Sequence, residues 1–227
     1  MGGGRVTPSR NEVAQRPPRD DLDLAGFPAE ESRGTTFYRA KRHDRGAWWF
    51  ASTEPDADGV DGGRFDLALP RGTCYWADSV EVAVRERLAH HVLTTNTVFA
   101  SRAREMVVVA ARASRGRRFA DVTDPRAVRS GVGAELQTMG DYRVPQAWAR
   151  AFDAAGFAGV RYSTRFTSAA AANAWAVFGA AGIPRRPRPE RVHRDGVTAC
   201  RESGIRVLDD GSDAGPERFT FADPPGS

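Results

Sequence analysis

Three polar residues at equal intervals carry most of the chemical content of this sequence. Arg64 and Tyr75 lie eleven positions apart, as do Tyr75 and Glu86. An arginine can hold a phosphate through a fork of two hydrogen bonds, a tyrosine ring can stack on a flat heterocycle, and a glutamate can stabilise positive charge on a sugar. These groups suit cleavage of the glycosidic bond of a nucleotide such as NAD. The competing interpretation is that three polar residues of a charged chain share a spacing by chance.

The segments that carry two of these residues have clear periodicity. A short strand is predicted at Thr73–Ala77, with Tyr75 inside it. Ser79 can cap the start of a helix that continues to about His91. The apolar positions of this helix recur every three or four residues, at Val80, Ala83, Val84 and Leu88. Glu86 lies outside that stripe, so its side chain must face either solvent or a cleft.

The remaining predicted elements do not alternate regularly. Further strands are predicted at 35–42, 105–113, 119–122, 159–163, 174–179 and 205–208. Helices are predicted at 124–129 and 144–155. Strands and helices mixed without a βαβ rhythm favour the α+β class.

The chain of 227 residues is long enough for one domain with tails. We expect a flexible N-terminal tail at 1–33, a catalytic domain at 34–209 and a loose C-terminal tail at 210–227, because Gly, Pro and charged residues dominate both ends. Within the domain, the segment 183–194 contains three prolines and five arginines, which favours a surface connection.

Charge and cysteine content limit the possible partners and compartments. The net charge is +4, which is a weak argument for nucleic-acid binding, so we do not expect a nucleic-acid partner. Cys74 and Cys200 are the only cysteines, and two lone thiols fit a reducing compartment. No apolar run approaches the roughly 20 residues that a membrane span needs, and the first residues lack the apolar core of a signal peptide. We therefore expect a cytoplasmic protein without membrane contact.

Several common catalytic motifs are missing from the sequence. It contains no phosphate-binding P-loop, no Gly-x-Gly-x-x-Gly and no Gly-x-Ser-x-Gly. His90 and His91 are adjacent, so on a helix they point about 100° apart and cannot easily share a metal ion. His43 and His193 have no partner at ligand spacing. We expect neither a metal site nor a bound cofactor.

Five short segments, taken in order, resemble the RES-domain family over roughly residues 35–183. They are Phe37-Tyr38-Arg39, Gly63-Arg64-Phe65, Tyr75-Trp76-Ala77-Asp78-Ser79 followed by Glu86, Gly159-Val160-Arg161-Tyr162-Ser163-Thr164-Arg165, and Ala176-Val177-Phe178-Gly179. The resemblance implies a split β-sheet core like that of ADP-ribosyltransferases, with a few flanking helices. It also implies an NAD-degrading activity, either glycohydrolase or phosphorylase, with NAD as substrate. Many members are toxins held in check by a cognate antitoxin.

The resemblance also implies roles for individual residues. Arg39 and Arg64 would bind the NAD pyrophosphate or an attacking phosphate, and we expect their side chains to converge on one anion. Tyr75 would stack on nicotinamide, and Glu86 would stabilise the ribosyl cation or position the nucleophile. Tyr38 and Arg165, within the matching segments, are further candidates for binding the substrate.

The family serine falls at one of two neighbouring hydroxyls. The pattern Tyr-x-Ser-Arg places Thr164 at the serine position, because Tyr162 and Arg165 match on either side. Ser163 would take the role if the register shifted by one. Neighbouring strand residues point to opposite faces, so only one of the two can enter the cleft. The frame favours Thr164.

Three functions remain open from the sequence. The first is the NAD-cleaving toxin, with water or a phosphate co-substrate as acceptor. The second is a transferase that moves ADP-ribose onto a macromolecule with the same site. The third is a non-catalytic nucleotide- or nucleic-acid-binding module, supported by the altered serine position and the basic loops. Because both tails are polar, we expect any antitoxin to be a separate chain.

Overall fold

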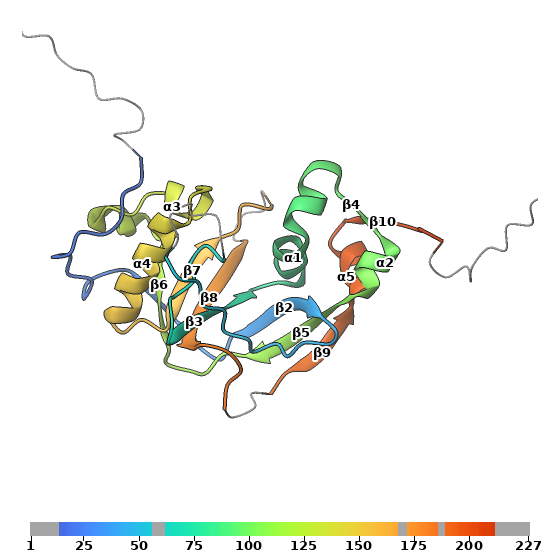
Figure 1. Cartoon of the computed structure of the whole chain (residues 1–227), viewed down its shortest axis with the longest axis horizontal. Coiled ribbons are helices and arrows are strands. Elements are labelled where there is room, and N and C mark those ends of the chain that lie inside the picture. The colour runs from blue at the N-terminus through green and yellow to red at the C-terminus, as the bar shows by residue number, and fades with distance from the viewer. Residues whose placement is uncertain (1–13, 56–61, 168–171, 186–188, 212–227) are drawn as a thin grey trace, which may run out of the picture.

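The computed structural model describes residues 14–55, 62–167, 172–185 and 189–211, and residues 1–13 and 212–227 of the two expected tails lie outside them. Its main feature is an eight-stranded mixed sheet in the order β1-β6-β7-β8-β3-β2-β5-β9 (Figure 1). These strands are β1 (Ala29–Glu31), β2 (Thr36–Arg42), β3 (Arg71–Ala77), β5 (Met106–Arg112), β6 (Arg118–Asp121), β7 (Gly159–Ser163), β8 (Asn173–Ala180) and β9 (Arg191–Asp195).

Helices flank the sheet, and a short second ladder lies beside it. The helices are α1 (Val80–Thr95), α2 (Ala100–Arg104), α3 (Glu135–Thr138), α4 (Arg143–Ala154) and α5 (Gly196–Glu202), with a 3₁₀ helix at Pro125–Ser130. The parallel ladder joins β4 (Thr97–Phe99) to β10 (Arg206–Leu208). The expected α+β class is confirmed. No helix in the described ranges is long and apolar enough to cross a membrane.

The sheet is split between β2 and β3. Strand β3 pairs with β8 along its whole length, and β2 does the same with β5. Between the described residues of β2 and β3, in contrast, the ladder holds at one register position, Tyr38↔Ala77. The expected split core is therefore present, and it divides the sheet into a half with α3 and α4 and a half with α2 and α5 (Figure 1).

Helix α1 lies across this split and contacts β2, β3 and β8. Its N-terminus is capped as predicted, since the Ser79 side chain accepts a hydrogen bond from the Val82 amide. Val84 and Leu88 of the predicted stripe are at most 2% exposed, so the apolar face fixes the rotation of the helix. This rotation decides where Glu86 points.

Two apolar cores cover the two faces of the sheet. One lies beneath the helices and includes Val84, Leu136 and Phe152. The other is rich in aromatic side chains: Phe37, Trp48, Phe50, Trp76, Phe119 and Trp175. Residues from the segment after β2 help to close this second face, so that segment is held against the sheet.

Parts of the expected tail and connection are ordered elements. Within the expected tail 1–33, Leu24 and Phe27 are buried and Ala29–Glu31 pairs with β6 as β1. The expected connection 183–194 ends in β9, an edge strand on β5. Both corrections have one physical reason: an edge strand is held by backbone hydrogen bonds and needs few apolar side chains. Helices α2 and α5 and strand β4 were also not predicted.

Candidate active site

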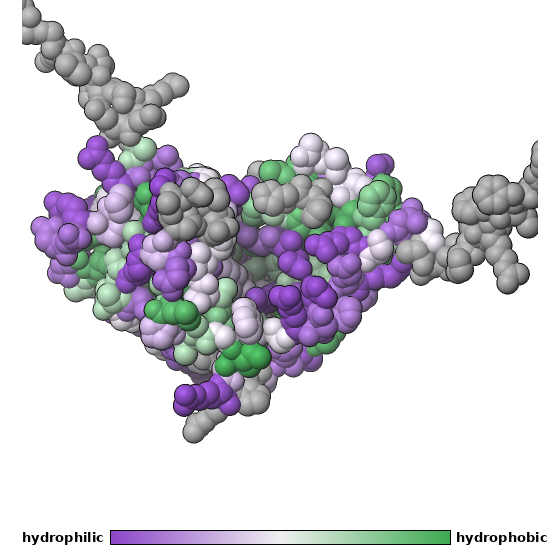
Figure 2. All heavy atoms as spheres, in the orientation of Figure 1, coloured by the Kyte–Doolittle hydropathy of each residue, from purple (hydrophilic) through white to green (hydrophobic). Residues whose placement is uncertain are grey.

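A cavity of about 490 Å³ opens at the split of the sheet. Figure 2 shows the surface hollowed between the two halves, with hydrophilic residues beside the hollow. The lining comes from β2, β3, α1, the segment before β3 and the segment after β7. Six of the predicted site residues line it together: Tyr38, Arg39, Arg64, Tyr75, Glu86 and Arg165. The fold thus gathers residues that are more than a hundred positions apart in the chain.

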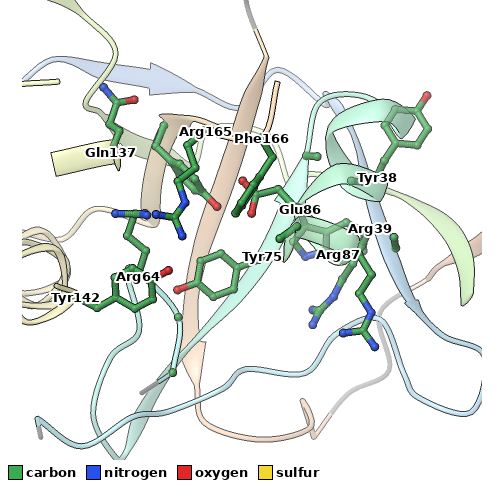
Figure 3. A pocket seen from close by; sticks show the side chains of 18 residues that line it. Tyr38, Arg39, Arg64, Tyr75, Glu86, Arg87, Gln137, Tyr142, Arg165 and Phe166 are labelled. Atoms are coloured by element: carbon green, nitrogen blue, oxygen red, sulfur yellow. The ribbon is translucent and has the colours of Figure 1, made fainter. Parts of the chain in front are cut away.

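Glu86 lies near the middle of this cavity (Figure 3). Burial raises the pKa of its carboxyl group above the usual value. A hydrogen bond with the Thr164 side chain and the positive charges of Arg64 and Arg165 act in the opposite direction, and burial outweighs them. The site therefore holds a partly desolvated carboxylate between two cations and a hydroxyl.

The two candidate hydroxyls differ in their surroundings. Thr164 is 7% exposed and its side chain is hydrogen-bonded to Glu86. Ser163 is fixed through its backbone, where its N–H donates to Gln137 Oε1 at 2.7 Å. Tyr162 of β7 lines the cavity, whereas Ser163 and Thr164 are not among its lining residues. The geometry therefore favours Thr164 as the hydroxyl that acts with Glu86.

Arg64 is held rigidly beside Glu86. Its Nη1 donates to the carbonyl oxygen of Met139 at 2.5 Å, and its guanidinium lies 4.8 Å from the centroid of the Tyr142 ring. The side chain belongs to a residue that is only 7% exposed, and burial lowers its pKa. A fixed guanidinium of this kind presents its remaining N–H groups to an anion at little entropic cost.

The Tyr75 hydroxyl has a structural role. It donates to Asp66 Oδ1 at 2.8 Å and accepts from the Phe65 N–H at 2.9 Å. The buried Asp66 also accepts from the Gly63 N–H at 2.7 Å. A Cβ on Gly63 would overlap both the Tyr75 hydroxyl and the Asp66 carboxylate, so glycine is required there. The network presents the face of the Tyr75 ring to the cavity and fixes the loop that carries Arg64.

Arg39 lies at the opposite end of the cavity from Arg64. Figure 3 shows Arg64 beside Arg165 and Arg39 beside Arg87, with Glu86 between the two pairs. Arg39 Nη1 donates to the carbonyl oxygen of Ala47 at 2.6 Å. The expectation that Arg39 and Arg64 converge on one anion is therefore wrong, because the split separates β2 from the loop that bears Arg64. The cavity instead has a pair of arginines at each end.

Tyr38 lines the cavity, but its ring packs 5.1 Å from the ring of His193. In Figure 3 it points away from the group around Glu86. A direct contact with the reacting part of a substrate is not supported for this residue.

Several further lining residues were not among the predicted site residues, and they include Arg87, Gln137, Tyr142, Tyr162 and Phe166. For Tyr162 a signal was available, because it precedes Thr164 by two positions on a strand. Arg87 follows Glu86 on a helix, so its proximity was implied but its direction was not. Gln137 and Tyr142 come from segments that only tertiary packing brings to the site.

Comparisons with known proteins bear on the family and the fold of this chain. A family model of the RES domain matches residues 36–195. A chain from the crystal structure of the M. tuberculosis MbcT–MbcA toxin–antitoxin complex has a similar fold, with a TM-score of 0.52 and 20% sequence identity. The similarity covers 78% of this chain and 92% of that one. A search of curated proteins gave no match.

Proposed function

This chain belongs to the RES-domain family, and on that premise we propose that it cleaves the nicotinamide–ribose bond of NAD. The observation that carries the proposal is the Glu86 carboxylate, hydrogen-bonded to Thr164 and lying between arginine pairs in a cavity at the split of the sheet. NAD is the substrate, and no resident cofactor takes part.

The chemistry needs few catalytic groups. The nicotinamide ring nitrogen of NAD is positively charged, so it leaves as a neutral molecule with the bonding electron pair and needs no proton. The ribose carbon left behind becomes an oxocarbenium-like cation. The Glu86 carboxylate stabilises that cation, and the arginines bind the pyrophosphate. Water or phosphate then attacks the ribose carbon.

The residues around Glu86 divide the remaining tasks. Thr164 orients the carboxylate through its hydroxyl, and the charges of Arg64 and Arg165 favour its ionised form against the effect of burial. The exposed face of Tyr75 stacks on nicotinamide. Preorganised groups of this kind are commonly worth about 10²–10³ in rate each.

Incubation of the purified chain with NAD, with and without inorganic phosphate, tests this function. Nicotinamide with ADP-ribose would identify hydrolysis, and nicotinamide with ADP-ribose-1″-phosphate would identify phosphorolysis. Nicotinamide release only when a protein or nucleic-acid acceptor is present would instead identify an ADP-ribosyltransferase. If wild-type protein shows no more turnover than Glu86→Gln, the chain is a binding module and the proposal is wrong.

We also propose that the chain acts in the cytoplasm as the toxin of a toxin–antitoxin pair. The similar fold comes from a toxin–antitoxin complex, which supports this assignment by analogy of fold. Induced expression in a bacterium should lower NAD and stop growth, whereas Glu86→Gln should do neither. Co-expression of the protein encoded by the neighbouring gene should restore growth. Unchanged NAD at abundant, folded expression would contradict the proposal.

A further inference from the structure

A second hollow of about 600 Å³ adjoins the first and shares Arg39, Ala40 and Arg87 with it. Its other walls come from the segment that follows β2, which supplies Arg45 and Trp49, among others, and from Ile183. Arg39 and Arg87 therefore lie at the boundary between the candidate active site and the second hollow.

The charge around this second hollow is almost entirely positive. Arg87 is exposed, but its partial desolvation lowers its pKa, and the charges of Arg102, Arg45, Arg39 and Arg42 lower it further. Arg42 is paired with Asp44 at 2.8 Å and Arg102 with Glu105 at 2.6 Å. Within the described part of the chain, neither Arg45 nor Arg87 forms an ion pair. Cations held together without a counter-charge are characteristic of an anion-binding site.

The segment that bears Arg45 is anchored, so the hollow is preformed. The Ala47 carbonyl accepts from Arg39 at 2.6 Å, and the Ala47 N–H donates to Glu190 Oε2 at 2.8 Å. Phe50 pairs with Gly182 through two backbone hydrogen bonds of 3.0 and 2.8 Å, which brings the segment that bears Ile183 beside the one that bears Trp49.

Two apolar side chains remain exposed on this framework. Trp49 is 50% exposed and Ile183 is 76% exposed, although the residues that flank Trp49 are buried. An exposed indole on an anchored segment offers a stacking surface for a flat base. The hollow thus combines an aromatic side chain, which can stack on the base of a nucleoside, with arginines outside any ion pair, which can bind its phosphate.

We propose that this second hollow holds the adenosine half of the dinucleotide and that Arg45 binds a phosphate monoester on its ribose, so that NADP is preferred to NAD. The proposal rests on the proposed function for the direction of the substrate. With the nicotinamide ribose at Glu86, the pyrophosphate reaches Arg39 and Arg87, whose two charges match its own. Arg45 then remains available to bind a further phosphate, a role that arginines have in NADP-binding sites.

Steady-state kinetics on the full chain provide the first test. The wild-type protein should show a kcat/KM for NADP at least about tenfold above that for NAD, the effect of one good charge-assisted hydrogen bond. Arg45→Ala should abolish this preference, because it should lower the value for NADP about tenfold more than the value for NAD. Arg129→Ala, which removes an exposed arginine elsewhere on the surface, should change neither. Equal values for both dinucleotides in the wild-type protein would overturn the proposal.

Binding of nucleotide fragments separates this inference from the proposed function. Calorimetry on the full chain should show adenosine 2′,5′-bisphosphate binding about tenfold tighter than AMP, with the difference lost in Arg45→Ala. This readout needs no bond cleavage, so it decides the inference even if NAD is never turned over. If Arg45→Ala instead weakens only the stimulation of cleavage by inorganic phosphate, the arginine serves a free co-substrate and the proposal is wrong.

Discussion

The two ends of the cavity differ in how their positive charge is compensated. At one end, Arg64 and Arg165 act on the carboxylate of Glu86, and all three lie among aromatic side chains. At the other end, Arg87 is surrounded by further arginines, and no carboxylate is among the charges that shift its pKa. The end at Glu86 is suited to stabilise a positive charge that develops during a reaction. The end at Arg87 is suited to bind a negative charge that the ligand already carries. Substitutions at the two ends should therefore affect different kinetic constants.

The largest effect is expected from Glu86→Gln. The substitution keeps the shape and removes the charge opposite the developing cation, so kcat for NAD cleavage should fall by about 10² or more, while the affinity for NAD changes little. Nicotinamide release in single-turnover experiments measures this directly. A variant that cleaves at near wild-type rate would remove Glu86 from the mechanism.

Removal of the Thr164 hydroxyl should have the next largest effect. Thr164→Ala breaks the hydrogen bond to Glu86 and should lower kcat by about tenfold, the usual cost of losing a bond to a charged group. Thr164→Ser keeps the hydroxyl and should retain activity. Ser163→Ala is the matched control and should stay within about twofold. The reverse pattern, with Ser163→Ala inactive, would show that the strand is assigned one position out of register.

At the other end of the cavity, Arg87→Ala should act on binding. If Arg87 binds the pyrophosphate as proposed, loss of its guanidinium should raise KM for NAD by several-fold to about tenfold with kcat within about twofold. The effect should also shrink at high ionic strength, because Arg87 is exposed. If kcat falls in proportion and KM is unchanged, the proposed division between the two ends is wrong.

The smallest effect concerns stability. Burial raises the pKa of Glu86 in the folded state, so its protonated form favours folding below the unfolded-state pKa, and this contribution is lost as pH rises through the folded-state pKa. Glutamine does not titrate. Glu86→Gln should therefore melt a few degrees above wild type at pH 7, and the difference should disappear towards pH 4. Thermal melts across this range provide the measurement, and a variant that is less stable at pH 7 would contradict it.

Much of the end of the cavity around Glu86 could be predicted from local pattern. The apolar stripe of α1 placed Glu86 outside the core. The Tyr-x-x-Arg frame favoured Thr164, whose side chain lowers the pKa of Glu86, and its role stays a prediction. Both are short-range properties, because helix and strand periodicity alone decide which way a side chain points. The family motifs then supplied the order of the segments.

The basic end depended on tertiary structure. The resemblance implied a split sheet, but nothing in the sequence shows that the split falls between β2 and β3, so the separation of Arg39 from Arg64 could not be predicted. The contact of Asp66 with Gly63 is local to one turn, but its contact with Tyr75 depends on how that turn packs against β3. Strand β9 was missed because edge pairing through the backbone leaves Val192 65% exposed and so produces no apolar pattern.

The split between β2 and β3 also determines where the sheet deforms most easily. Between the described residues, β2 and β3 pair only at Tyr38↔Ala77. Widening the split would therefore break few ladder hydrogen bonds, whereas bending either half of the sheet would break many. Helix α1 bridges the split. The buried side chains beneath this helix, which include Val84 and Leu88, therefore determine the width of the split. Because the same side chains fix the rotation of α1, the width of the entrance and the direction of Glu86 are set together.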